Sequence, residues 1–199
     1  MTKIAIFASG SGSNAENIIK YFANNEDVNI QLIVSNKEDA YVHQRAKNLG
    51  VESVTYSRSD FYHTGKVLEC LLQKGIDFIV LAGFLLKIPE NLLRAYPDKI
   101  INIHPALLPK FGGKGMYGDN VHKAVVESGD AESGITIHYV NENYDEGAVI
   151  FQAKCPVSAT DSYEDVAKKV HALEYTYFPV IIDKLLNKRR AESDDFGFE

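Results

Sequence analysis

Short apolar runs alternate with segments of helical periodicity in the first half of the chain, and this alternation constrains the fold most strongly. Residues 4–8, 30–34, 78–81 and 100–104 are predicted strands. The third run is almost wholly apolar, as in a sheet that is covered on both faces. Strands that alternate with helices imply right-handed crossovers. We therefore predict an α/β fold with a doubly wound, mostly parallel sheet and helices on both faces.

The pattern changes after about residue 130. Residues 135–140 alternate strictly and residues 148–153 form a second apolar run, which predicts a C-terminal β-hairpin. Asp161-Ser162-Tyr163-Glu164 resembles a capping box that opens a long helix to about Asn187, and Pro179 is expected to kink or split it. Residues 1–188 are predicted to form a single domain, and residues 189–199 a polar tail.

Composition excludes several classes of protein. The formal net charge of −6 argues against a non-specific nucleic-acid binder. The two cysteines, Cys70 and Cys155, form no CxxC pair, and no spacing of histidines and cysteines indicates a metal. No apolar run approaches the ~20 residues of a membrane helix, and the N-terminus does not resemble a signal peptide. We expect a cytoplasmic protein with small-molecule partners, no membrane contact and no metal; the oligomeric state stays open.

A glycine-rich turn, Ser9-Gly10-Ser11-Gly12-Ser13-Asn14, follows the first predicted strand and precedes a helix. Free N–H groups in the first turn of a helix and its dipole favour an anion. Ser13 and Glu16 also fit a capping box. The turn matches neither GxGxxG nor GxxxxGK[ST], so a phosphomonoester fits better than a dinucleotide or nucleoside triphosphate. The alternative is a glycine-rich connection that binds no ligand.

Asn102 and His104 lie at the end of a predicted strand that Pro105 terminates. Strand residues two apart point to the same face, and ligands bind at the carboxyl ends of strands in open α/β sheets. An amide donor can stabilise a developing oxyanion while an imidazole moves a proton. The alternative is a histidine whose hydrogen bonds are satisfied by backbone groups. A carboxylate near His104 would raise its pKa, and Asp145 could supply it if the fold brought the two together.

These motifs resemble the folate-dependent phosphoribosylglycinamide formyltransferase family over nearly the whole chain. The matching segments are Ser9–Asn14, Leu81-Ala82-Gly83-Phe84, Asn102-Ile103-His104-Pro105-Ala106-Leu107-Leu108-Pro109 and Tyr144-Asp145-Glu146-Gly147. The resemblance implies transfer of a formyl group from the co-substrate 10-formyltetrahydrofolate to the amine of glycinamide ribonucleotide, in purine biosynthesis.

The resemblance also implies roles for individual residues. Asn102, His104 and Asp145 match the catalytic amide, imidazole and carboxylate of the family. The residues that match the substrate-binding segments are Gly12, Ser13 and Asn14 for the phosphate, and Glu174 within His171-Ala172-Leu173-Glu174 for the ribonucleotide. The residues that match the folate-binding segments are Leu85, Leu86, Lys87, Ile88, Asn102, Asn141, Glu142, Asn143, Tyr144 and Asp145.

The chain departs from the family pattern in its glycine-rich segment 111–118, which is either a mobile lid or binding loop, or an ordinary surface insertion. Lys87 also follows Leu86 where the family commonly has an arginine and then an aliphatic residue. Three other functions stay open. A formyltetrahydrofolate hydrolase would carry an N-terminal regulatory domain, and a methionyl-tRNA formyltransferase a basic C-terminal domain. A catalytically silent sensor of a phosphorylated ligand would share the fold alone.

Overall fold

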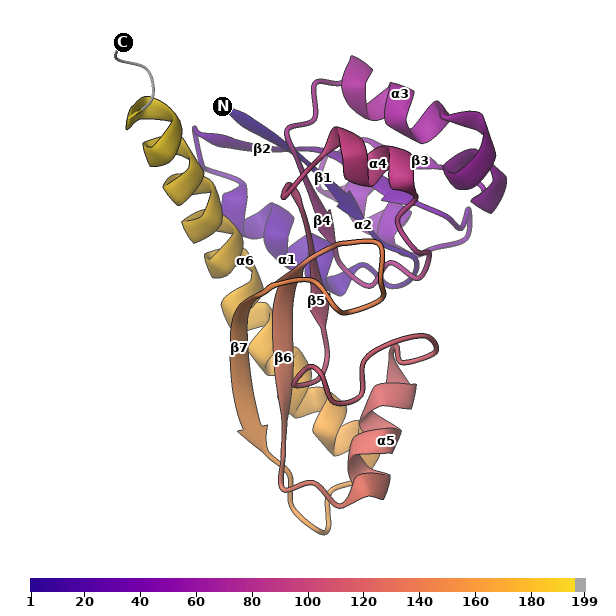
Figure 1. Cartoon of the computed structure of the whole chain (residues 1–199), viewed down its shortest axis with the longest axis vertical. Helices are drawn as coiled ribbons and strands as arrows, with labels where there is room; N and C mark the ends of the chain where they lie inside the picture. Colours follow the sequence, from indigo (N-terminus) through magenta and orange to yellow (C-terminus); the bar gives the residue numbers. More distant parts are fainter. Residues whose placement is uncertain (196–199) are drawn as a thin grey trace.

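A seven-stranded sheet in the order β3-β2-β1-β4-β5-β6-β7 forms the centre of the computed structural model, which describes residues 1–195 (Figure 1). The strands are β1 (Thr2–Phe7), β2 (Val28–Ser35), β3 (Ser53–Thr55), β4 (Phe78–Leu81), β5 (Ile100–His104), β6 (Glu132–Tyr139) and β7 (Val149–Pro156). The helices are α1 (Ser13–Phe22), α2 (Val42–Asn48), the π-helix η1 (Asp60–Thr64), α3 (Lys66–Gln73), α4 (Glu90–Ala95), α5 (Asp119–Ser128) and α6 (Tyr163–Asp195).

Strand pairing confirms the predicted doubly wound sheet. Strands β1 to β5 pair in parallel, and β6 and β7 add an antiparallel hairpin beside β5. The four predicted parallel strands are all present. Strand β3 was not predicted, because its three half-buried residues form too short a run to show a period.

Each face of the sheet has its own apolar core. Along β1, Ile4 and Ile6 belong to one core and Ala5 and Phe7 to the other, as the period of two requires. The first core includes apolar residues of α1, α5 and α6, and the second includes residues of α3 and α4. The prediction that helices cover both faces is therefore confirmed. Two covered faces leave the ends of the parallel strands as the place where ligands can enter.

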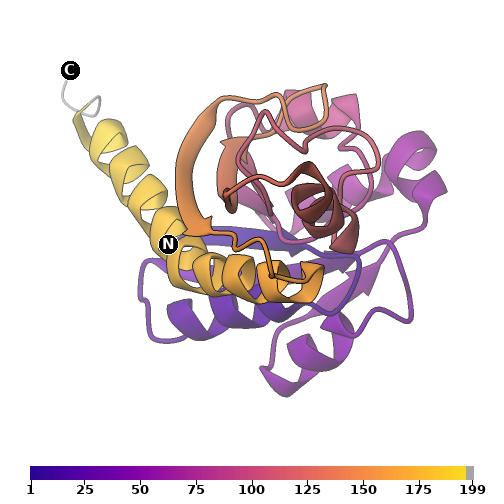
Figure 2. The same ribbon diagram turned by 90° about the horizontal axis from the view of Figure 1, so that it is seen from below.

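Helix α6 is longer than the sequence indicates. Its cap is a reciprocal pair in which the Asp165 N–H donates to Ser162 Oγ (3.2 Å) and the Ser162 N–H donates to Asp165 Oδ2 (3.1 Å). The helix continues through Pro179, so the predicted split does not occur; Phe178 and Ile182, both fully buried, pack against the sheet on either side of that residue. Figure 2 shows α6 running across this face together with α1.

The predicted tail lies only partly within the described residues. Helix α6 continues past residue 189 to Asp195, and residues 196–199 lie outside the described part of the chain. Among the helices of residues 1–195, none combines the length and the apolar character needed to cross a membrane.

Candidate active site

A cavity of about 490 Å³ opens at the carboxyl ends of β1, β4 and β5. Its walls include residues 9–14 after β1, residues 82–88 after β4 and residues 102–105 at the end of β5. The loop of the β6–β7 hairpin and residues of α5 and α6 close the remaining sides. This is the edge of an open α/β sheet where a ligand is expected, because the helices that follow the neighbouring strands β1 and β4 pack on opposite faces and leave a crevice between the two connections.

The turn after β1 has the geometry of an anion cradle. Gly12 precedes α1 with φ 72°, a left-handed conformation that favours glycine. A Cβ at this position would lie 2.4 Å from Val42 Cγ2, so a side chain has no room. Ser13 and Asn14, at the start of α1, line the cavity, where first-turn N–H groups have no acceptor within the helix. The cradle can therefore hold a phosphate.

Neighbouring elements hold this turn in place. The Val42 N–H donates to the Gly10 carbonyl (3.1 Å), and Arg45 Nε donates to the Ser11 carbonyl (2.8 Å). Arg45 also pairs with Glu16. The predicted Ser13–Glu16 capping box is wrong: no side chain caps α1, and the carboxylate of Glu16 binds Lys20 and Arg45 instead. The box fails by one residue, because Gly12 is the N-cap and Ser13 is already the first residue of the helix.

Asn102 and His104 point to the same side of β5, as their spacing predicts, and both line the cavity. In the antiparallel pairing with β6, Asn102 lies opposite His138 and His104 lies opposite Thr136. The His104 ring is almost completely buried, and its Nε2 lies 2.7 Å from the Phe111 carbonyl. The imidazole therefore has a fixed orientation.

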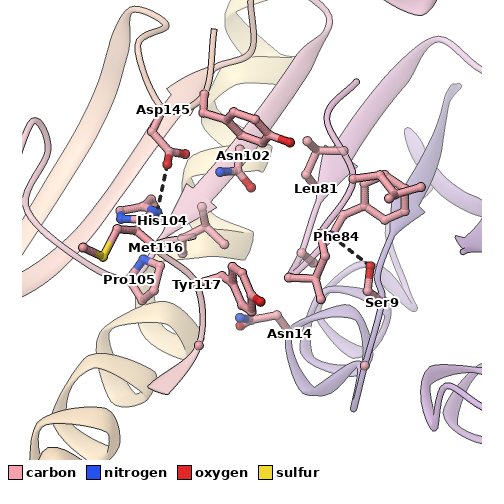
Figure 3. Close-up of a pocket in the computed structure, with 18 of the residues that line it drawn as sticks. Ser9, Asn14, Leu81, Phe84, Asn102, His104, Pro105, Met116, Tyr117 and Asp145 are labelled. Carbon is pink, nitrogen blue, oxygen red and sulfur yellow. Dashed lines mark hydrogen bonds and ion pairs between the residues drawn. The ribbon is translucent and has the colours of Figure 1, made fainter. Parts of the chain in front are cut away.

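The fold brings Asp145 to this pair although the two are far apart in sequence. The loop of the β6–β7 hairpin places Asp145 Oδ2 3.6 Å from His104 Nδ1 and Oδ1 3.6 Å from His138 Nε2. The Gly113 N–H donates to Asp145 Oδ2 (2.9 Å). Figure 3 shows the carboxylate directed at His104, with Asn102 beside them. An amide, an imidazole and a carboxylate thus converge on one wall of the cavity.

Burial and neighbouring groups set the charge states of the His104 imidazole and the Asp145 carboxylate. Burial lowers the pKa of His104, and Asp145 and the Phe111 carbonyl oppose it without reversing the direction. The predicted effect of the carboxylate is present, but the imidazole is not held charged. Burial also raises the pKa of Asp145, yet the facing imidazoles and the Gly113 N–H hold that pKa below its usual value. Asp145 is therefore anionic at neutral pH, beside an imidazole that can accept a proton.

A second polar cluster lies near the anion cradle. Glu174 is 5% exposed, and its Oε2 accepts hydrogen bonds from Asn14 Nδ2 (2.9 Å) and His171 Nδ1 (2.9 Å). Hydrogen bonding to Glu174 raises the pKa of His171. Within the described residues, Asn14 Oδ1 and the buried Nδ1 of His122 have no hydrogen-bond partner. Unsatisfied buried atoms beside a cavity can bind the hydroxyl groups of a ligand.

The opposite wall is mainly apolar. Leu81, Phe84, Ile88 and Val140 line the cavity there, and a flat aromatic ring system fits such a surface. Ser9 fastens this wall to the cradle, because its Oγ accepts the Leu85 N–H (2.9 Å) (Figure 3).

Most of the residues named from the resemblance line this cavity. The lining residues among them are Gly12, Ser13, Asn14, Leu85, Leu86, Lys87, Ile88, Asn102, His104, Asn141, Asn143, Tyr144, Asp145, His171 and Glu174. Three others, Glu142, Ala172 and Leu173, do not line it. Glu142 is exposed on the hairpin loop, and Ala172 and Leu173 lie on other sides of α6 because a helix turns about 100° per residue.

The glycine-rich segment also contributes to the wall. Gly113, Gly115, Met116, Tyr117 and Gly118 line the cavity, and the Phe111 carbonyl and the Gly113 N–H contact His104 and Asp145. Figure 3 shows Met116 and Tyr117 among the side chains that line the cavity together with His104 and Asn14. The segment is thus part of the site rather than a distant surface insertion.

Several polar lining residues have no catalytic or binding role in the sequence interpretation; Lys37, Asp119, His122 and His138 are among them. Lys37 follows the carboxyl end of β2, so the rule that pointed to His104 could have found it. His138 alternates with buried isoleucines and faces Asn102 only through the β5–β6 register. Nothing in the sequence distinguishes His122 from a surface position on α5. No group of His, Cys, Asp or Glu within residues 1–195 is arranged to hold a metal ion.

Comparison with known proteins agrees with this geometry. The formyl transferase family model matches residues 2–182. The chain is 39% identical to the chloroplastic phosphoribosylglycinamide formyltransferase of Arabidopsis thaliana, over 94% of this chain and 66% of that protein. It is 34% identical to the phosphoribosylglycinamide formyltransferase of Haemophilus influenzae, over 100% of this chain and 93% of that protein.

Solved structures give the same result. The crystal structure of phosphoribosylglycinamide formyltransferase from Bacillus halodurans has a TM-score of 0.85 and 34% identity, covering 94% of this chain and 97% of that one. That of glycinamide ribonucleotide transformylase 1 from Geobacillus kaustophilus has a TM-score of 0.84 and 35% identity, covering 94% and 99%. The chain spans slightly under two thirds of the plant relatives, at 66% and 62%, and nearly all of the bacterial ones. The chain belongs to the formyl transferase family, in its phosphoribosylglycinamide formyltransferase branch.

Proposed function

We propose that this protein transfers the formyl group of 10-formyltetrahydrofolate to the amine of glycinamide ribonucleotide, a step of purine biosynthesis. The convergence of Asn102, His104 and Asp145 in the cavity that also contains the Gly12 cradle carries this proposal. A phosphate in the cradle would hold one substrate at a helix N-terminus while its amine reaches the end of β5. Membership of the family supports the reaction class.

The two walls of the cavity suit the two substrates. The phosphate would be bound by Gly12, Ser13 and Asn14. The sugar hydroxyls would be bound by Glu174 with His171, because a carboxylate accepts the hydrogen bonds that hydroxyl groups donate. Leu85–Ile88 and the hairpin-loop residues Asn141, Asn143 and Tyr144 would bind the folate. Ala172, Leu173 and Glu142 would act through the backbone or by supporting these residues, since their side chains do not line the cavity.

The chemistry follows from the charge state of His104. A neutral imidazole can accept the proton that the amine loses as it attacks the formyl carbon. The imidazolium that forms lies 3.6 Å from the Asp145 carboxylate, which stabilises the new charge. The Asn102 amide donates to the oxygen on which negative charge develops. His104 then returns the proton to the departing folate nitrogen, so no covalent enzyme intermediate is required.

Formyl release measured with and without glycinamide ribonucleotide tests the proposal. Release that depends on the amine supports transfer; release to water in its absence would identify a hydrolase instead. In Asn102→Ala, loss of an oxyanion donor should lower kcat by about 10²–10³ with little change in substrate affinity. Asn48→Ala, which changes an exposed amide at the end of α2, is the matched control. Near-normal turnover in Asn102→Ala would contradict the assignment.

We also propose that the enzyme works in the cytoplasm on small molecules and does not bind nucleic acid. The thiols of Cys70 and Cys155 are both free, which suits a reducing compartment. The net charge of −6 repels a polyanion. Fractionation of cells that express the tagged chain and a filter-binding assay with duplex DNA and RNA would test these two points.

A further inference from the structure

His138 is a buried polar residue to which the mechanism above gives no task. It lies directly opposite Asn102 in the β5–β6 pairing and is 2% exposed. Directly opposed residues of antiparallel strands place their side chains on the same face of the sheet, within contact distance. The imidazole therefore shares the cavity wall with Asn102 and Asp145.

One ring nitrogen of His138 is committed to the backbone. Nδ1 lies 2.8 Å from the Tyr139 carbonyl, which can only accept a hydrogen bond. Nδ1 therefore carries a hydrogen. Gly147 passes close to this contact: a Cβ there would lie 1.7 Å from the Tyr139 oxygen and 3.5 Å from His138 Nδ1. Any residue other than glycine at position 147 would disturb the bond.

The other ring nitrogen faces two side chains at different distances. Nε2 is 3.1 Å from Asn102 Nδ2, within hydrogen-bond range, and 3.6 Å from Asp145 Oδ1, beyond it. In a neutral ring with its hydrogen on Nδ1, Nε2 has a lone pair and accepts from the amide. The contact with Asn102 therefore fixes which end of that amide is nitrogen and which is oxygen.

We propose that His138 is a positioning residue that holds the Asn102 amide with one N–H bound to its Nε2 and the second N–H free for the developing oxyanion. This inference rests on the proposed function, in which Asn102 is the oxyanion donor. Without an acceptor at Nε2 the amide can turn by half a rotation and present its oxygen to the reaction. A carbonyl oxygen repels the oxyanion that the N–H would stabilise.

Two substitutions test the contacts of the two ring nitrogens separately. In His138→Gln, the side-chain oxygen can reach the position of Nε2 and accept from Asn102, whereas the donor to Tyr139 is lost. In His138→Asn, the amide nitrogen can replace Nδ1 and donate to Tyr139, whereas the acceptor for Asn102 is lost. We expect kcat of His138→Asn to fall by tenfold to a hundredfold with KM nearly unchanged, and His138→Gln to lose less than tenfold. Equal losses in the two variants, or a greater loss in His138→Gln, would overturn the proposal.

The wild-type protein supplies a second measurement that does not depend on how the variants fold. Nitrogen-15 NMR of the labelled histidines should show the His138 ring with its hydrogen on Nδ1 and a lone pair on Nε2 at the pH of the assay. A hydrogen on Nε2 would overturn the proposal, because that nitrogen could then only donate. Failure of the proposed function would be seen separately, as absence of amine-dependent formyl release from the wild-type enzyme.

Discussion

Replacing Asp145 with asparagine removes one negative charge from the site with almost no change in shape. The carboxylate lies 3.6 Å from His104 Nδ1 and accepts the Gly113 N–H, and an asparagine oxygen can still accept that bond. At an effective dielectric constant of about 20, two unit charges at this distance attract each other by about 5 kcal/mol. The proposed mechanism places a positive charge on His104 only during the reaction. Loss of this attraction should therefore lower kcat by roughly 10³–10⁴.

The pH dependence of activity gives a second prediction for Asp145→Asn, namely the direction in which the pH–activity profile shifts. Burial lowers the pKa of His104 from its ordinary value of 6.5, so the activity limb that reports this group should lie below pH 6.5. Asp145 raises the pKa of His104, so its removal should move the limb to still lower pH. Comparing the variant with the wild type cancels the titrations of the substrates themselves.

Single-turnover kinetics with excess enzyme would measure both effects, because they isolate the chemical step from product release. Asp39→Asn, at an exposed position before α2, is the control for the loss of one charge. A turnover within tenfold of the wild type would refute the assigned role of Asp145. A limb that moves to higher pH would refute the electrostatic argument.

Two further predictions concern the substrate end of the cavity. In Gly12→Ala the unfolding free energy should fall by at least 1–2 kcal/mol, on the order of a left-handed backbone penalty, because φ is 72° and a Cβ would meet Val42. The variant should also bind phosphate more weakly. In urea titrations the control is Gly10→Ala, because nothing lies within 4 Å of its added Cβ. His122→Phe removes a buried nitrogen that has no hydrogen-bond partner, so the unfolding free energy of the variant should rise by about 1–3 kcal/mol. Calorimetry should show weaker binding of the ribonucleotide to this variant. A lower urea midpoint than that of the wild type would contradict this reasoning.

Part of the site could be predicted because it depends on local periodicity. Asn102 and His104 share a face because residues two apart in a strand always do, and Pro105 ends the strand at the ligand-binding edge. The cradle at Gly12 follows from a strand, a glycine-rich turn and a helix in succession. The cap of α1 was predicted wrongly, because Gly12 rather than Ser13 is its N-cap, and Glu16 pairs with Arg45 of another helix. Of the two outcomes expected at Pro179, a kink or a split, the split does not occur, because burial of Phe178 and Ile182 holds the helix on the sheet.

The alternation of strands with helices, the anion cradle and the polar pair at the end of β5 were determined by the sequence itself, since each arises from neighbours along the chain. Only the tertiary structure decided that Asp145 faces His104, that burial lowers the pKa of His104, and that His138 contacts Asn102. Those contacts depend on the register between β5 and β6 and on the path of the hairpin loop. Distance and desolvation are properties of the packed chain, and the residue types at these positions do not specify them.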